Sequence, residues 1–336
     1  TQDQLYDMCP TGLKTSINSE NPNKTGLRMA FKGYRLDQDH PLASFLQDQN
    51  QSAKATQLLW EPISLAALNT PIEVASTKVF LNVLKDTLAS SAWFSLKNNN
   101  DFLLAKQDLS ELIGRSASAY LRQHGVRIKL KQRITGISKS DLGFHLSGAE
   151  EATVYSHVVL ATAPHNANQL MLGLSELHAE RMALASFDYQ PIVTVYLQYP
   201  THTKLRLPMI GLTNGLGQWV FDRGQLCQQH GLLAVVISGT GSHQNLSQAQ
   251  LAEALTDQLK QAFPELSCPL WHKVFAEKRA TYACKPELIR PPSQTALPNF
   301  YLAGDYCYAD YPATIEGAVR SGLICAELIQ ASHKVG

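Results

Sequence analysis

The residues best suited to chemistry lie near the end of the chain, in the stretch FYLAGDYCYADYPATIEGAVRSG. An apolar strand predicted over 300–303 leads directly to Gly304 and Asp305, and open α/β sheets bind ligands at the carboxyl ends of such strands. A helix predicted from Pro312 follows a short loop, and we expect its free N–H groups and positive dipole end to face Asp305. The pattern indicates a site for an electron-rich or anionic group.

The loop between this strand and this helix is rich in tyrosine. Tyr306, Tyr308 and Tyr311 all fall between Asp305 and Pro312. Three aromatic rings in so short a loop are enough to form a wall. Such a wall would either stabilise a cation through the ring faces or seal a bound cofactor.

The final helix carries an apolar stripe beside a stripe of small residues. Ile315, Val319 and Leu323 make the apolar stripe, and Gly322 lies in the small one. Glycine weakens a helix by about 1 kcal/mol relative to alanine, so its presence calls for a packing reason. We therefore expect this helix to lie close to a strand or to a ligand.

Length and composition narrow the possible functions. The 336 residues suffice for two domains, and a net charge of +1 without a basic run gives no electrostatic reason to expect nucleic acid. The six cysteines are scattered and no Cys/His cluster has metal-ligand spacing, so no metal site is expected. No stretch approaches the roughly eighteen apolar residues that a transmembrane helix needs.

Helical periodicity dominates the first third of the chain. Between 27 and 88 the apolar spacing predicts several short helices, because Pro62 and Pro71 interrupt the pattern. An amphipathic helix is predicted over 109–124, with Gly125 as its C-terminal cap.

Strands are predicted by alternating or continuous apolar runs. Val126, Ile128 and Leu130 alternate with charged residues, which is typical of a half-exposed strand. The continuous run 158–161 predicts a strand buried on both faces, and His165 beyond it is expected to be a surface turn residue. Further strands are predicted at GFHLSG, PIVTVYLQY, QWVFDRG, LLAVVIS and KVFAEKRATYAC, and further helices at 166–184 and 247–264.

The closing motif LAGDYCYADYPATIEGAVRSG resembles that of the amine oxidase and phytoene desaturase superfamily of flavoproteins, and PATIEGAVRSG is similar to its hydroxysqualene dehydroxylase branch. Other segments agree in order, namely LLWEPISLAALNTP, VFLNVLKD, VVLATAPH, QWVFDRG and EKRATYACKP. The likeness runs from about Leu27 to the end of the chain. It implies an α/β (α+β) fold with two domains, an incomplete Rossmann-like FAD-binding domain and a substrate domain of mixed sheet and helices.

The resemblance also implies how the two domains alternate along the chain. Residues 1–114 would form the helical part of the substrate domain, and 171–284 its sheet. Residues 115–170 and 285–336 would form the middle and C-terminal parts of the FAD-binding domain.

A set of FAD-binding residues is implied by the closing motif and by two earlier strands: Gly304, Asp305, Pro312, Ala313, Thr314, Ile315, Glu316, Ile134, Ala161 and Thr162. Asp305 would bind the ribityl chain or lie beside the pyrophosphate. The backbone N–H groups from Thr314 to Glu316 would stabilise negative charge on the pyrimidine edge of the reduced flavin. Ile134 would pack on the adenine, and Thr162 would line the dinucleotide crevice.

The substrate implied by the resemblance is an apolar isoprenoid, hydroxysqualene, whose C–OH would be reduced to C–H. This reaction needs an acid, for which Glu61 and Asp310 are candidates, with Asn69 as a hydrogen-bonding positioner. Glu61 lies in an otherwise apolar region, yet it could equally be a helix-end carboxylate, and Asp310 a solvated loop residue. The substrate would contact aromatic side chains, namely Trp60, Tyr306, Tyr308 and Tyr311.

One departure from the resemblance concerns the nucleotide-binding loop. The family opens with a strand–GxGxxG–helix unit, and the chain contains no such sequence, since GLTNGLG lacks the spacing and is interpreted as a turn. The chain begins at Thr1 without a methionine, so we expect a fragment preceded by that unit. Taken alone, it should bind FAD weakly or not at all.

Two other classes of function remain open. The chain could belong to a carotenoid-type desaturase or an amine oxidase of the same superfamily, or to a lipid-binding relative without a cofactor. A cytoplasmic protein is expected, with possible peripheral contact to a membrane because squalene-like molecules dissolve in bilayers. The residues identify no electron donor for the flavin.

Overall fold

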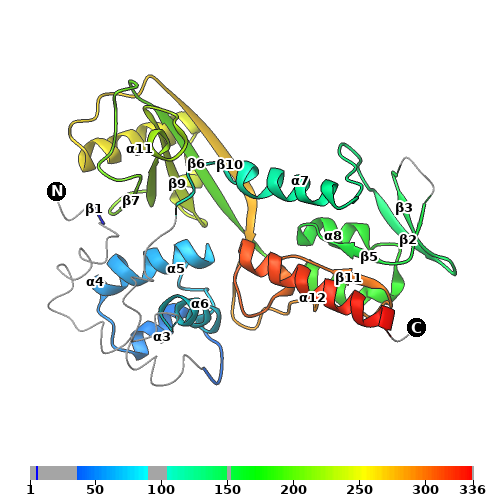
Figure 1. Cartoon of the computed structure of the whole chain (residues 1–336). Coiled ribbons are helices and arrows are strands. Elements are labelled where there is room, and N and C mark those ends of the chain that lie inside the picture. Colours follow the sequence, from blue (N-terminus) through cyan, green and yellow to red (C-terminus); the bar gives the residue numbers. More distant parts are fainter. Residues whose placement is uncertain (1–4, 7–35, 90–103, 150–152, 335–336) are drawn as a thin grey trace.

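The computed structural model describes residues 5–6, 36–89, 104–149 and 153–334. Three regions are distinct in Figure 1: a bundle of short helices at the lower left, a large antiparallel sheet above it, and an α/β region at the right that contains the chain's last helix. Both the helical bundle and the antiparallel sheet meet the α/β region at the loop that precedes this last helix.

The helical bundle is built from five short helical elements: α3 (Leu42–Asp48), α4 (Ala53–Ala55), the π-helix η2 (Thr56–Trp60), α5 (Glu61–Leu68) and α6 (Thr77–Ala89). Pro62 lies in the first turn of α5, where a missing N–H costs nothing, and Asn69 ends that helix in the left-handed conformation with φ 49°. The prediction of several short helices is confirmed within 36–89.

The large sheet has six strands in the order β1-β7-β8-β9-β6-β10 and is antiparallel throughout. Its strands are β1 (Leu5–Tyr6), β6 (Tyr189–Gln198), β7 (Met209–Leu212), β8 (Trp219–Asp222), β9 (Leu232–Ser238) and β10 (Trp271–Tyr282). Helix α11 (Gln248–Ala262) covers one face of this sheet, and α10 (Arg223–Cys227) and η5 (Ser242–Asn245) are short connections. The strands predicted at 191–199, 218–224, 232–238 and 273–284 are confirmed.

The α/β region is organised around a parallel strand pair, β5 (Val158–Leu160) and β11 (Phe300–Leu302). Its helical elements are α8 (Pro164–Leu170), η4 (Ser175–Leu177), α9 (His178–Ala185), η6 (Asp305–Cys307) and α12 (Ile315–Lys334). The helix predicted over 166–184 is therefore divided into α8 and α9. A core of side chains from α8, α9, β5 and β11 continues into the helical bundle.

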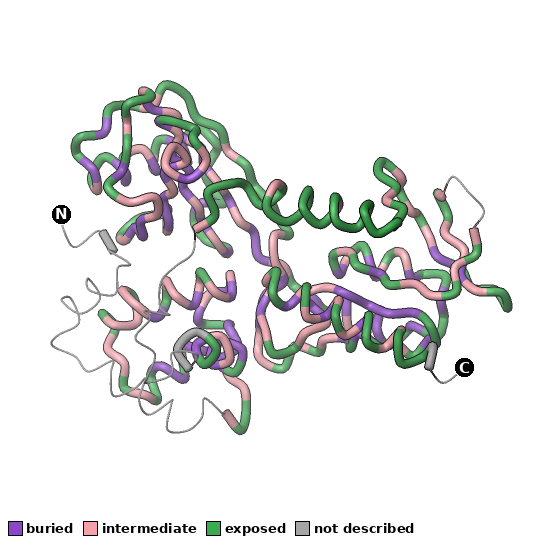
Figure 2. The backbone as a smooth tube through the Cα atoms, in the orientation of Figure 1, coloured by how far each residue is buried: buried purple, intermediate pink, exposed green. Residues whose placement is uncertain are grey.

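An antiparallel ribbon and a long exposed segment complete this region. The ribbon consists of β2 (Gly136–Ser140), β3 (Gly143–Ser147) and β4 (Val154–Tyr155). The predicted helix 109–124 forms as η3 (Ser110–Arg115) and α7 (Ser116–Gln123), and Gly125 follows with φ 77°. Figure 2 shows α7 exposed over most of its length, with Ser118 as the one half-buried residue.

The strand predicted at 126–130 is wrong. Val126 and Leu130 are 46% and 73% exposed, and regular pairing starts only at Gly136. A strand needs a neighbour that accepts and donates ladder hydrogen bonds, and the described part of the chain pairs no strand with this stretch.

The prediction that strand 158–161 is buried on both faces is also wrong. Val159 in the centre of β5 is 41% exposed. The apolar stripe of α12 is likewise exposed, by 53–59% at Ile315, Val319 and Leu323, and Gly322 has open space beside it. Helix α12 instead packs on β11 through the opposite face.

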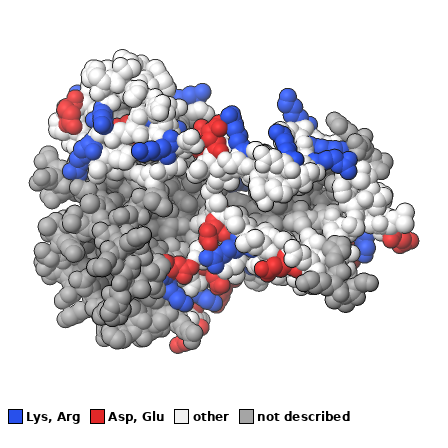
Figure 3. All heavy atoms as spheres, viewed as in Figure 1, with Lys and Arg blue, Asp and Glu red and all other residues white. Residues whose placement is uncertain are grey.

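Charged side chains of both signs are mixed over the face shown in Figure 3, with Lys and Arg gathered along the upper right edge, where the chain carries α7 and the stretch after it. Among the described helices, none is both long and apolar enough to cross a membrane.

Candidate functional site

The parallel pair of strands β5 and β11 brings the carboxyl ends of both strands to one edge of the α/β region. Leu160 and Leu302 are in register, and the Ala303 N–H donates to the Leu160 carbonyl at 3.1 Å. The residues that follow each strand, Thr162 after β5 and Asp305 after β11, therefore leave the pair at the same edge. This is the edge at which parallel sheets bind ligands.

Asp305 also lies against the first turn of α12. A side-chain carbon added at Gly317 would meet the Asp305 Cα at 3.6 Å, an ordinary van der Waals distance, which places the strand end beside this turn of the helix. The Ser321 hydroxyl accepts the Gly304 N–H at 2.8 Å and fixes the strand end to the second turn of the helix. Sequence and structure agree that the strand end and the helix start are joined.

The start of α12 keeps backbone N–H groups available. Thr314 caps the helix, since its Oγ1 accepts the Gly317 N–H at 3.1 Å. The N–H groups of Ile315 and Glu316 precede that bond and have no acceptor in the described part of the chain. Together with the helix dipole they favour an anionic or electron-rich group.

The carboxyl of Asp305 is largely shielded from solvent. Burial raises its pKa, while the Tyr306 N–H, which donates to Asp305 Oδ1 at 2.9 Å, and the nearby positive charge of Arg290 act in the opposite direction. A carboxyl in this setting is available to a ligand hydroxyl as an acceptor, or as a donor when it is protonated.

Two of the buried polar atoms without a partner, Tyr189 Oη and Tyr306 Oη, belong to residues close enough to Asp305 for its charge to act on them. The buried, unsatisfied side-chain atoms in this part of the described chain come from five different elements or their ends: Thr162 Oγ1, His165 Nδ1, Tyr189 Oη, Thr281 Oγ1 and Tyr306 Oη. The rings of His165 and Tyr189 are in edge contact at 5.7 Å, so His165 is not the surface turn residue that the sequence suggests. Such atoms normally find partners, which makes this cluster a site for a polar ligand.

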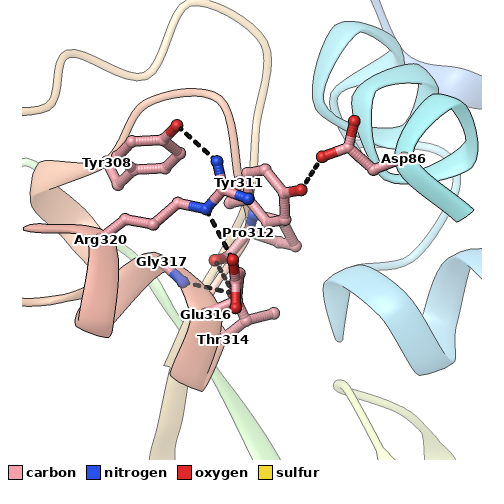
Figure 4. Close-up of polar contacts among 8 residues, drawn as sticks. All are labelled: Asp86, Tyr308, Tyr311, Pro312, Thr314, Glu316, Gly317 and Arg320. Atoms are coloured by element: carbon pink, nitrogen blue, oxygen red, sulfur yellow. Dashed lines mark hydrogen bonds and ion pairs between the residues drawn. The ribbon is translucent and has the colours of Figure 1, made fainter. Parts of the chain in front are cut away.

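The aromatic loop forms with two tyrosines instead of three. Tyr308 and Tyr311 lie 5.6 Å apart, and the Arg320 guanidinium of α12 lies over both rings (Figure 4). Tyr306 is 1% exposed and packs on Phe187 in the core, so it cannot belong to the wall that was predicted.

The predicted catalytic trio does not converge. Glu61 is exposed at the start of α5, where partial burial and the negative charge of Glu73 raise its pKa. Asn69 ends the same helix, whereas Asp310 is exposed on the aromatic loop. Residue type alone placed these three together, and of them only Asp310 belongs to the loop beside α12.

One further predicted contact, Trp60, takes another role. Trp60 is buried in the helical bundle, where its Nε1–H donates to Gln51 Oε1 at 2.6 Å and its ring meets the edge of Phe80. Ile134 lies half-buried just before β2, and Ala161 is exposed after β5. Pro312 is buried and Ala313 half-buried at the entrance to α12, beside the predicted site.

Sequence analysis missed the inner polar side chains of the site. Tyr189 precedes the alternating pattern by which β6 was predicted, and Arg290 lies outside any recognised motif. Arg320 lies within the closing motif, but the sequence assigned it no role. Spatial proximity to Asp305, which no local pattern encodes, is what identifies them.

The fold and the site define a dinucleotide-binding α/β protein with an added antiparallel sheet. The sequence matches the flavin containing amine oxidoreductase family over residues 5–330. The chain belongs to this family, whose cofactor is FAD.

Relatives and solved structures agree with that assignment. The chain is 28% identical over 293 residues to the hydroxysqualene dehydroxylase of Rhodopseudomonas palustris, covering 85% of this chain and 65% of that protein. It is 25% identical to the zeta-carotene desaturase of Synechocystis, covering 82% of this chain and 62% of that one. The chain thus spans less than two thirds of these relatives.

Among solved structures, the fold is similar to that of cyclohexylamine oxidase from Brevibacterium oxydans. The TM-score is 0.61 at 16% identity, and the match covers 88% of this chain and 68% of that one. At this low identity, the structural likeness shows a shared fold.

The residues present fit FAD. Its ribityl hydroxyls and ring carbonyls can pair with the unsatisfied buried atoms around Asp305, and the free amides of Ile315 and Glu316 suit the electron-rich pyrimidine edge. Asp305, the start of α12 and Thr162 are therefore the residues that would hold the cofactor.

Proposed function

We propose that this chain forms the greater part of an FAD-dependent oxidoreductase that reduces hydroxysqualene to squalene. The proposal rests first on the named relatives, among them the hydroxysqualene dehydroxylase of Rhodopseudomonas palustris. The observation that carries the substrate class is an apolar face of the six-stranded sheet, on the side opposite α11.

This apolar face is defined by register. Tyr196 pairs with Ala234, which pairs with Phe221, so the three side chains lie in one row across the sheet. Phe275 from β10 joins them, with its ring 5.7 Å from that of Tyr196. Lys273, which is directly opposite Tyr196, lies on the same face at its edge, with its Nζ 4.9 Å from the centre of the Phe275 ring. These residues are half-buried or exposed with the exception of Ala234, whereas the face under α11 is closed.

The apolar face continues toward both the helical bundle and the cofactor site. At Gly239, beside one end of the face, Leu65 of α5 and Pro71 lie within 4 Å of where a side chain would be. Strand β10 runs from the face to Tyr282, whose hydroxyl donates to the Tyr311 carbonyl at 3.4 Å. A long hydrocarbon between sheet and helices would therefore reach the aromatic loop.

The chain's own residues have separate tasks in this reaction. The apolar face and the helical bundle would bind the hydrocarbon and exclude water, while the rings of Tyr308 and Tyr311, over which the Arg320 guanidinium lies, would contact the substrate at the aromatic loop. Reduced FAD would supply the hydride, and a proton would leave with the hydroxyl as water. Asp310, on the same loop, is the proposed proton donor.

The test uses the full-length gene product loaded with FAD, with the flavin chemically reduced for hydroxysqualene and left oxidised for phytoene and cyclohexylamine. It is incubated separately with hydroxysqualene, phytoene and cyclohexylamine, and the products are identified by mass spectrometry. Squalene from hydroxysqualene alone supports the proposal. Desaturated phytoene or an oxidised amine, without squalene, would replace it with another reaction.

A carotenoid-type desaturation is the second candidate. The likeness to the zeta-carotene desaturase spans 319 aligned residues, and the apolar face would accept a carotenoid chain equally well. The same panel separates the two, because desaturation requires the oxidised cofactor and dehydroxylation the reduced one.

A further inference from the structure

Arg290 connects three parts of the site without belonging to a helix or strand. It lies between β10 and β11, and its Nη1 donates to the carbonyls of Tyr308, at 3.0 Å, and of Tyr311. Its Nη2 donates to Cys284 Sγ at 3.4 Å, and the guanidinium centre lies 4.9 Å from the Tyr282 ring.

The two carbonyls that Arg290 binds belong to the aromatic loop. Between Tyr308 and Tyr311 the backbone forms a turn in which the Tyr311 N–H donates to the Tyr308 carbonyl at 3.3 Å. The planar guanidinium holds both acceptors in a fixed geometry, which a lysine ammonium cannot reproduce. Arg290 therefore determines the path of the backbone that carries both tyrosine rings.

The other end of the Arg290 contact network is anchored in the helical bundle. Cys284 is fully buried, its N–H donates to Thr70 Oγ1 at 3.0 Å, and its carbonyl accepts the Ser76 N–H at 2.7 Å. Movement of the loop relative to the bundle would thus be resisted through the Arg290 side chain.

The outer side of the loop has its own contacts, shown in Figure 4. Arg320 of α12 donates to Glu316 at 2.7 Å and to the Tyr308 hydroxyl at 3.2 Å, and the Tyr311 hydroxyl donates to Asp86 of α6. The rings of Tyr308 and Tyr311 are thereby held between α12 and the helical bundle, while Arg290 binds the backbone of the same loop.

We propose that Arg290 is a positioning residue, which sets the aromatic loop so that Tyr308 and Tyr311 face the substrate between α12 and α6. This inference rests on the proposed function for the identity of the substrate, but not for the position of the loop. The Arg290 side chain acts through the two carbonyls and does not need to touch the substrate. Its charge also lies close enough to Asp305 to act on that carboxyl.

The experiment compares Arg290→Lys and Arg290→Gln with wild-type full-length protein. Arg115→Gln is the matched control, because Arg115 is an exposed arginine paired with Glu111 on η3, away from the site. Amide hydrogen exchange is measured over 306–312 and over β9. The KM and kcat for hydroxysqualene are measured in parallel.

Arg290→Lys should speed exchange in 306–312 by about tenfold or more, because it leaves a carbonyl of the loop without its partner. Exchange in β9 should not change, and KM should rise more than kcat falls. Arg290→Gln should show the same pattern more strongly. Loop exchange in Arg290→Lys equal to wild type, or faster exchange in β9 and in the loop alike, would overturn the assignment.

The two proposals fail separately. If the wild-type protein does not convert hydroxysqualene, the proposed function fails, and loop exchange in the Arg290 variants still decides whether Arg290 positions the loop. If squalene is formed and both variants keep the wild-type KM and loop exchange, only the role of Arg290 is refuted.

Discussion

Replacing Ser321 with alanine perturbs the joint between strand β11 and helix α12. Ser321 is 0% exposed, its Oγ accepts the Gly304 N–H at 2.8 Å, and it donates to the Ala318 carbonyl at 2.7 Å. The substitution leaves the Gly304 N–H buried without a partner. An unsatisfied buried donor costs about 1–3 kcal/mol, so the free energy of unfolding should fall by about that amount.

Urea denaturation measures this loss, and the same helix supplies the control. Ser332 donates to the Ile329 carbonyl at 2.7 Å, the same kind of helix bond, but it is exposed. Ser332→Ala should therefore change stability by less than about 0.5 kcal/mol. If Ser321→Ala destabilises the protein no more than Ser332→Ala, the joint between β11 and α12 does not hold the site together.

Three further changes have expected outcomes. Thr314→Ala removes the cap that binds the Gly317 N–H and should lower stability by about 0.5–2 kcal/mol in thermal unfolding, with Thr314→Ser retaining most of it. Because burial raises the pKa of Asp305, its ionisation opposes folding as the pH rises above the ordinary value of 3.8, so Asp305→Asn should gain stability relative to wild type between pH 3 and pH 7. A relative stability that stays constant over that range would contradict the burial effect. Phe275→Asp places a charge on the apolar face beside Tyr196 and should raise the KM for an apolar substrate about tenfold or more, whereas Phe275→Leu should change it little.

The sequence predicts an element correctly when the residues of that element alone show the pattern that defines it. The strand 300–302, the turn to Asp305 and helix α12 follow from a short apolar run and a proline-preceded helix start, and all three form. The long antiparallel strands are equally visible, as in β6, which alternates buried and half-buried residues along most of its own length, although it pairs with a strand as distant in the chain as β10.

Predictions fail where the described chain supplies no partner for the predicted element. Val126 to Leu130 alternates like a strand, yet strand pairing requires a neighbour, and the described residues supply none there. The exposed Val159 shows the same dependence, since β5 pairs only with β11 among the described strands. Local periodicity indicates which secondary structure a segment prefers, but not which segment will lie beside it in the fold.

The side chains of the site are predicted only in part. Asp305 and Thr314 belong to a recognisable motif, whereas Arg290, before two prolines, carries no signal in the sequence. The sequence predicts Tyr306 in the aromatic wall because of its residue type. In the structure its ring is buried, because the short 3₁₀ turn η6 directs it toward Phe187. Type and spacing identify the elements, but the direction of a side chain requires the fold.

The most direct test of the central claim is a crystal structure of the full-length gene product with FAD. The account predicts that the pyrimidine edge of the isoalloxazine ring lies at the amides of Ile315 and Glu316, with the Asp305 carboxyl at the ribityl chain. A ring bound elsewhere, with side chains filling the space between Asp305 and the start of α12, would contradict it.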